Sequence, residues 1–274
     1  MLVPGSDHLA VDLSEVTADI DGRFLEDDGV ARVAAFLENG SPVPVDLTGE
    51  RIGAPIARPS AIYGIGLNYR DHAAEAGMPL PTEPVVFTKA PNSVVGPTDP
   101  IVIPAGATQV DWEVELGVVV GRRAANLASP AEARNHIAGY VAVNDVSERA
   151  WQMEQPGQWL KGKSFATANP AGPFLVTPDE VPAPEGLGLA LAVNGTTMQH
   201  GSTADMVFTA EFIVWYLSRY LVLEPGDLID TGTPAGVGLK QSPPRFLAPG
   251  DIVELEVEGI GKHRTEVEAA GPRS

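Results

Sequence analysis

The 274-residue sequence predicts a β-dominated α+β protein with few short helices, preceded by a small N-terminal β module. Three observations lead to this fold class. Short runs rich in Val and Ile recur along the chain, polar and apolar residues alternate within many of them, and 29 glycines and 25 prolines separate them. Alternation with a period of two is typical of strands, and Gly and Pro mark the turns between them.

The N-terminal module is expected to contain a hairpin. Residues 31–38 and 41–45 are predicted as its strands, because the Asn39-Gly40 dipeptide between them favours a type I′ turn. Residues 53–59 have the composition of a linker. We therefore assign the module and its linker to residues 1–55 and the main domain to residues 56–274.

The main domain is predicted to consist largely of strands. Their expected ranges are 85–88, 101–103, 110–120, 140–143, 189–193, 228–230 and 252–257. The last strand opens a terminal hairpin whose loop is Gly259-Ile260-Gly261. Glu254, Glu256 and Glu258 alternate with apolar residues there, which indicates a strand with one face in solvent.

Three helices are predicted in the main domain. A short one follows Asn68, a residue suited to N-capping, and ends at Gly77. A second begins with the capping box from Ser129 to Glu132, with Gly139 as its stop signal. The third begins near Thr209, and its many large apolar residues indicate a packed helix.

Composition excludes several classes of function. The net charge of −18 repels nucleic acid and anionic membranes, so we expect binding to neither. No stretch approaches the ~20 apolar residues that a membrane span needs, and the N-terminus lacks the pattern of a signal peptide. The absence of cysteine fits a reducing compartment. We expect a cytoplasmic protein.

Three acidic residues form the first candidate site. Glu113 and Glu115 occupy alternate positions of one predicted strand, and Asp145 ends the next apolar run. Side chains two apart share a face of a strand, so both glutamates are expected to point the same way. Three converging carboxylates suit hard cations such as Mg²⁺, Mn²⁺ or Ca²⁺. The glutamate pair alone fits a solvated strand face equally well.

A second candidate lies in the short helix after Asn68. His72 and Glu75 are three residues apart and therefore share a helix face. A carboxylate in this position can orient a neutral imidazole and raise its basicity, as removal of a proton from water requires. The alternative is an exposed pair without a role.

The segment from Gly157 to Ser164 matches the phosphate-loop pattern, but its context does not. A phosphate loop follows a buried strand and opens a helix, whereas Pro156 precedes this segment and Trp159 occupies a position that is usually small. We therefore do not expect nucleotide binding at Lys163.

Five ordered motifs together resemble the fumarylacetoacetate hydrolase family over roughly residues 56–268. They are Ile65–His72, Trp112–Gly117, Asn144–Arg149, Lys161–Ser164 and Thr231–Gly238. The sequence is most similar to the bacterial branch that hydrolyses 2,4-diketo acids, including 2,4-diketo-3-deoxy sugar acids. The resemblance implies the mixed β-roll of this family and favours a homodimer.

The resemblance also implies roles for individual residues. Glu113, Glu115 and Asp145 would bind Mg²⁺ or Mn²⁺, with Ca²⁺ as a substitute in vitro. His72 and Glu75 match a dyad on a mobile lid helix, and Lys163 matches an active-site lysine. Contacts to the substrate would come from Arg149, Gln152 and Thr233.

The chemistry of these residues agrees with hydrolysis of a C–C bond. Attack of water on the 4-keto carbon, aided by His72 and Glu75, and cleavage of the C3–C4 bond would leave an enolate of pyruvate. A divalent ion supplies the electron sink that an enolate needs, and a lysine ammonium stabilises an oxyanion. The products would be pyruvate and a carboxylic acid.

Two other classes stay open at this point. Decarboxylation of oxaloacetate or isomerisation of a 2-keto acid would use the same enolate, so a lyase or isomerase is the main alternative. A silent metal-binding homologue is less favoured, because it would need no dyad for activating water.

Overall fold

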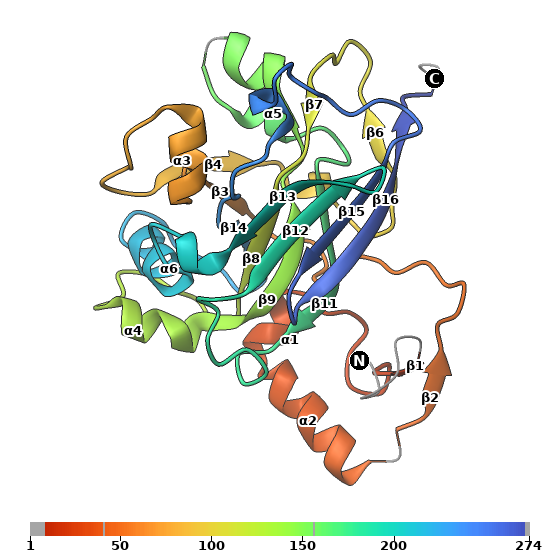
Figure 1. Ribbon diagram of the computed structural model, residues 1–274. Helices are drawn as coiled ribbons and strands as arrows, with labels where there is room; N and C mark the ends of the chain where they lie inside the picture. The colour runs from red at the N-terminus through yellow and green to blue at the C-terminus, as the bar shows by residue number, and fades with distance from the viewer. Residues whose placement is uncertain (1–8, 41, 156, 272–274) are drawn as a thin grey trace.

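The protein consists mainly of two β-sheets packed against each other, which confirms the predicted β-dominated class (Figure 1). The computed structural model describes residues 9–40, 42–155 and 157–271. The seven-stranded sheet has the order β4 (Val85–Lys89), β3 (Ile62–Gly66), β14 (Leu228–Asp230), β8 (Val114–Val120), β9 (Ile137–Asn144), β11 (Asn169–Val176) and β5 (Val94–Val95). The five-stranded sheet has the order β13 (Thr196–Ser202), β12 (Gly188–Val193), β15 (Ile252–Val257), β16 (Gly261–Ala269) and β6 (Ile101–Ile103).

Two smaller strand pairs complete the β structure. β7 (Val110–Asp111) pairs with β10 (Ser147–Glu148), and β1 (Leu9–Val11) pairs with β2 (Pro44–Asp46). The strands expected at 85–88, 101–103, 140–143, 189–193, 228–230 and 252–257 are all present, with ends shifted by no more than a few residues. The exposed positions of Glu254, Glu256 and Glu258 are also confirmed.

β8 is buried along its whole length because both of its faces are covered. Leu116 and Val118 belong to the larger core, which the five-stranded sheet and α6 (Ala210–Ser218) also line. Val119 belongs to a second cluster on the opposite face, where Phe24 and Leu25 contribute from α1 (Gly22–Glu26). This double burial explains why residues 116–120 read as a continuous apolar run.

The helices are short and lie around the sheets (Figure 1). Besides α1 and α6 they are α2 (Gly29–Asn39), α3 (Arg70–Ala76), α4 (Pro130–Ala133) and α5 (Leu160–Lys163), and a π-helical turn spans Ala150–Glu154. The predicted cap at Ser129 is confirmed, because Ser129 accepts a hydrogen bond from Glu132 N, but Gly139 does not stop that helix: α4 already ends at Ala133, and Gly139 lies in β9. The third helix begins near Thr209 as expected, and Thr209 accepts a hydrogen bond from Phe212 N. Within the described parts of the chain, no helix is long and apolar enough to cross a membrane.

The predicted N-terminal hairpin is wrong. Residues 29–39 form α2, and β2 pairs with β1 instead of with residues 31–38. Val30, Val33, Ala34 and Leu37 follow helical spacing, and Val33 packs against the second apolar cluster. Val30 and Ala34 are exposed and Leu37 is only partly buried, so the contact made by Val33 and the helix preference of the alanines together outweigh the turn preference of Asn39-Gly40. Ser41, the expected start of the second strand, lies outside the described residues.

Two further predictions need correction. The strand expected at 110–120 is interrupted at Trp112 and Glu113, between β7 and β8. Asn68 does not cap α3: its amide donates to the carbonyls of Phe208 and Thr231, and its side-chain oxygen accepts from Phe208 N. Asn68 therefore ties the start of the α3 segment to two distant loops, while Gly77 ends α3 as expected, with φ of 69°.

A buried histidine joins the two sheets. His263 on β16 is 4% exposed, and its Nε2 lies 3.1 Å from Ala142 O on β9 and 2.8 Å from Gly172 O on β11. Nε2 must carry the proton, because both partners are acceptors. Burial lowers the pKa of His263 to about 4, and the two carbonyls offset this only in part.

His263 should make stability dependent on pH. In the unfolded chain the imidazole of His263 is protonated to its charged form near pH 6.5, and in the folded chain only near pH 4. The stabilisation from the neutral buried imidazole is therefore complete above pH 6.5 and is lost as the pH falls toward 4. His263→Gln retains an N–H donor but does not titrate. The difference in unfolding free energy between wild type and this variant should narrow by about 2 kcal/mol between pH 7.5 and pH 5. Urea titrations at both pH values measure it, and an unchanged difference would contradict the assignment.

Candidate metal centre and active site

The structure brings Glu113, Glu115 and Asp145 together. One carboxylate oxygen from each lies within 4.8 Å of the others, and all three side chains are buried. The pairing of β8 with β9 produces this convergence, because Val114 is opposite Asn144 and Asp145 follows directly. Asp145 N donates to Glu113 O at 2.9 Å, and Glu113 N donates to Asn144 Oδ1 at 3.0 Å. The acids therefore do not lie on a solvated strand face.

Three buried cations surround the acids. Lys163 Nζ lies 2.6 Å from both Glu113 Oε2 and Asp145 Oδ2, and Arg149 Nη2 donates to Glu113 Oε1 at 2.7 Å. Lys89 Nζ donates to Asp145 Oδ1 and, at 2.8 Å, to Ala168 O. Sequence reasoning missed Lys89. The sequence does contain an indication of its role: Val85, Phe87 and Lys89 occupy alternate positions of one strand, so Lys89 is expected on the same buried face as Phe87.

The buried charges of this cluster do not balance. Among the described residues the cluster contains five buried carboxylates, Glu113, Glu115, Asp145, Asp111 and Asp230, against three cations, Lys89, Lys163 and Arg149. Two other buried carboxylates, Glu148 and Asp227, lie outside it and accept backbone N–H groups. Two negative charges remain in the cluster if every group is ionised, and uncompensated charge is costly in a protein interior. A divalent cation would neutralise them, and an all-oxygen donor set suits Mg²⁺ or Mn²⁺. The residues therefore fit the implied metal.

Among the three acids of the candidate metal site, ionisation is least favourable at Glu115. Burial would raise the pKa of Glu113, but Lys163 and Arg149 outweigh burial and lower it. The pKa of Glu115 is raised by burial and by the neighbouring Asp145 and Asp230. Burial also raises the pKa of Asp230 to about 7, and nearby Asn169 offsets this only in part, because no hydrogen bond of ordinary geometry reaches the Asp230 oxygens within the described residues.

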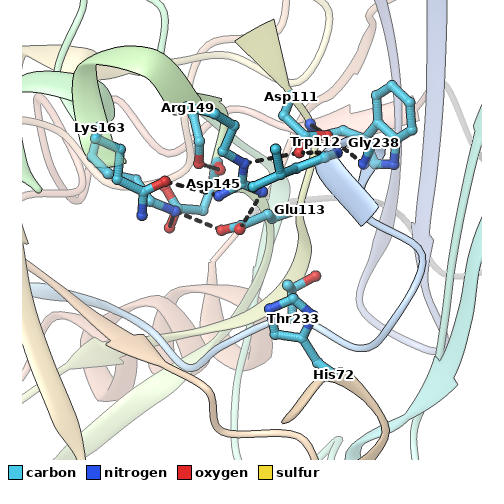
Figure 2. A network of polar contacts seen from close by, with 12 residues as sticks. His72, Asp111, Trp112, Glu113, Asp145, Arg149, Lys163, Thr233 and Gly238 are labelled. Atoms are coloured by element: carbon cyan, nitrogen blue, oxygen red, sulfur yellow. Dashed lines mark hydrogen bonds and ion pairs between the residues drawn. The ribbon is translucent and has the colours of Figure 1, made fainter. Parts of the chain in front are cut away.

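His72 and Glu75 form the expected pair on α3. His72 Nδ1 lies 3.0 Å from Glu75 Oε2, and Glu75 Oε1 accepts a hydrogen bond from Gly236 N at 2.9 Å. Glu75 is thus held at both oxygens. Figure 2 shows His72 opposite Glu113, with Thr233 beside it. The dyad therefore faces the acidic cluster.

The residues expected to contact substrate are engaged with other protein groups. Arg149 Nη1 donates to Gln152 Oε1 at 3.0 Å, besides its bond to Glu113. Thr233 Oγ1 donates to Val114 O and accepts from Gln199 Nε2, both at 2.8 Å. Gln199, which sequence reasoning also missed, accepts from Val114 N at 2.9 Å and so holds Thr233 against the start of β8.

Lys163 lies on an aromatic support. Its Nζ is 5.0 Å from the centroid of the Phe87 ring, and that ring is 5.5 Å from Trp159. The Phe87 ring packs over residue 64 of the neighbouring strand β3. This position must be glycine, because a Cβ there would lie 2.1 Å from the ring. Lys163 ends a four-residue helix that no buried strand immediately precedes, and its ammonium is bound by carboxylates. The phosphate-loop match is therefore coincidental.

Comparison with known proteins agrees with this geometry. The model of the C-terminal domain of fumarylacetoacetate hydrolase matches residues 61–268. The chain belongs to the fumarylacetoacetate hydrolase family. A curated relative from Burkholderia multivorans is 50% identical over 261 residues, which cover 94% of this chain and 91% of the relative, and its name states no substrate.

Two solved structures show the range of activities among such relatives. Fumarylacetoacetate hydrolase of Exiguobacterium antarcticum is 38% identical with a TM-score of 0.76, and the match covers 85% of this chain and 83% of that one. A 5-carboxymethyl-2-hydroxymuconate delta-isomerase of Mycobacterium smegmatis is 36% identical with a TM-score of 0.75, covering 86% and 88%. One is thus a hydrolase and the other an isomerase.

Binding of a divalent cation should stabilise the fold. A ligand present at about 100 times its Kd adds about 2.7 kcal/mol, so saturating Mn²⁺ should raise the melting temperature by roughly 5 °C. Glu115→Gln should remove most of this rise. Glu256→Gln is the matched control, because Glu256 alternates on an exposed strand face, and it should retain the rise. Differential scanning calorimetry measures both, and equal responses of the two variants would contradict this metal site.

Proposed function

We propose that this protein is a divalent-metal-dependent hydrolase that cleaves the C–C bond of a 2,4-diketo acid to give pyruvate and a carboxylic acid. The substrate would be an acylpyruvate or a 2,4-diketo-3-deoxy sugar acid. The observation that carries the proposal is the His72–Glu75 pair, which faces the cluster of buried carboxylates and lysines. A protein that only bound a metal would have no use for such a base.

The dyad can activate water. With Nδ1–H donating to Glu75 at 3.0 Å, the imidazole of His72 keeps Nε2 as an acceptor for a proton. The second hydrogen bond of Glu75, from Gly236 N, fixes the carboxylate and with it the orientation of the ring. His72 would remove a proton from the water that attacks the 4-keto carbon.

Lys163 and Lys89 would supply positive charge to a substrate bound at the acidic cluster, since both ammonium groups contact its carboxylates. Both are buried, so their ammonium groups act in surroundings where charge is poorly screened. Lys163 would stabilise the oxyanion that water attack produces. A divalent ion held by Glu113, Glu115 and Asp145 would supply Lewis acidity at the 2-keto acid end of the substrate.

A lyase or isomerase is the second candidate. The isomerase of Mycobacterium smegmatis is nearly as similar to this chain as the hydrolase of Exiguobacterium antarcticum. Decarboxylation of oxaloacetate would also use the metal site, but it needs no attacking water. We rank hydrolysis first because the dyad is intact.

The direct test is pyruvate release. A panel of 2,4-diketo acids with methyl, phenyl and deoxy-sugar acyl groups is incubated with enzyme and Mn²⁺ beside oxaloacetate, and a coupled lactate dehydrogenase assay records pyruvate. We expect Mn²⁺-dependent release from at least one diketo acid at a higher kcat/KM than from oxaloacetate. Release from oxaloacetate alone would favour the lyase.

The dyad should matter unequally for the two reactions. His72→Ala or Glu75→Ala should lower hydrolysis of a diketo acid about a hundredfold or more, as loss of a general base does, while decarboxylation of oxaloacetate falls much less. His200→Ala, at an exposed histidine on β13, is the control and should leave both rates unchanged. Steady-state kinetics of each variant on both substrates measure the ratio. Equal losses would mean that His72 and Glu75 serve only to close the site.

A further inference from the structure

Asp111 is a fully buried carboxylate for which the proposed reaction has no role. Its Oδ1 accepts hydrogen bonds from Trp112 N at 2.8 Å and Gly238 N at 2.7 Å. Its Oδ2 accepts from Arg149 Nε at 2.8 Å and Leu239 N at 3.0 Å. These four bonds leave no oxygen for a substrate or a metal. Asp111 must therefore act through the groups that it holds.

One of these groups connects Asp111 with the acidic cluster. The guanidinium of Arg149 donates through Nε to Asp111 and through Nη2 to Glu113 Oε1. Figure 2 shows the row from Gly238 through Asp111 and Arg149 to Glu113. Because Arg149 is shared between two carboxylates, its charge is not available to Glu113 alone. Glu113 keeps negative charge for a cation.

The other groups give Asp111 a fixed position. Gly238 N and Leu239 N belong to the turn that follows the Thr231–Val237 segment. The approach of this turn requires glycine, because a Cβ at position 238 would lie 2.7 Å from Asp111 Oδ1 and 2.0 Å from Arg245 O. Backbone donors that cannot rotate away hold the carboxylate, so the direction of Arg149 is also set.

We propose that Asp111 is a positioning residue for the metal site: it fixes the direction of Arg149 and draws part of the guanidinium charge away from Glu113. The inference rests on the proposed metal site, but not on which carbon–carbon bond is cleaved. Without the Asp111 charge, Arg149 would pair more closely with Glu113 and repel an incoming cation. Loss of Asp111 therefore weakens metal binding.

The test is Asp111→Asn, with Mn²⁺ affinity measured directly by isothermal titration calorimetry on the chelator-treated protein. Loss of a group that orients a metal ligand typically weakens affinity about 10- to 100-fold, and we expect a Kd raised within that range. In an Arg149→Gln background the same change should alter Kd less than about twofold, because Asp111 acts through Arg149. An unchanged Mn²⁺ Kd in Asp111→Asn would overturn the proposal. So would a 10- to 100-fold rise in Kd when Asp111→Asn is added to the Arg149→Gln variant.

Glu148→Gln is the matched control. Glu148 is also a fully buried carboxylate, lies on β10 beside β7, and accepts backbone N–H bonds from Thr108, Gln109 and Trp151. It forms no ion pair within the described ranges. Its variant should bind Mn²⁺ within about twofold of wild type, and weakening equal to that of Asp111→Asn would reveal a general packing effect and overturn the proposal.

A second variant covers the case in which Asp111→Asn does not fold, and the binding measurement separates the role of Asp111 from the proposed reaction. If Asp111→Asn does not fold, Asp111→Glu replaces it: the longer side chain keeps the charge but displaces Arg149, so weaker Mn²⁺ binding supports the proposal and unchanged binding overturns it. Calorimetry needs no substrate. Failure of wild type to release pyruvate while binding Mn²⁺ would refute the proposed reaction, and not the role of Asp111.

Discussion

The organisation of this molecule depends on an excess of negative charge buried between two paired strands. β8 and β9 meet in a register that places Glu113 and Glu115 next to Asp145, deep enough that solvent cannot screen them. Lys89, Lys163 and Arg149 compensate part of that charge, each through direct bonds to an acid of the cluster. Burial of so many ions is costly for stability, which argues that the cluster is retained for chemistry.

The segment from Thr231 to Leu239 connects the parts of the site. Gly232 N donates to Glu115, Gly236 N donates to Glu75, and Gly238 N donates to Asp111. Residues of the acidic cluster and of the dyad thus depend on one stretch of backbone. All three donors are glycines, and a Cβ would lie 3.0 Å from Ile65 O at position 232, 2.0 Å from Met198 O at 236 and 2.0 Å from Arg245 O at 238. This close approach to neighbouring backbone explains why the segment Thr-Gly-Thr-Pro-Ala-Gly-Val-Gly is rich in glycine.

The errors made from the sequence have identifiable physical causes. The Asn39-Gly40 dipeptide favoured a hairpin, but Val30, Val33 and Leu37 have helical spacing, and the packing of Val33 against the second apolar cluster, with the helix preference of the alanines, overrode the turn signal. Asn68 has the residue type of a helix cap, yet its amide is used to bind loops near Phe208 and Thr231. In both cases a partner distant in the sequence decided the outcome, and local preference carries no information about such partners.

The sequence by itself determined the β-dominated class, most strand positions, the resemblance to the family and the acids and dyad that could carry chemistry. It did so because alternation, capping and motif order are local properties. The alternation of Glu254 and Glu256 correctly indicated a solvated strand face, but only the tertiary structure decided that Glu113 and Glu115, which alternate in the same way, are buried. It also revealed Lys89, Asp111 and Gln199. Their roles arise from contacts across 38 to 127 residues of chain, formed only when the sheets close around the site.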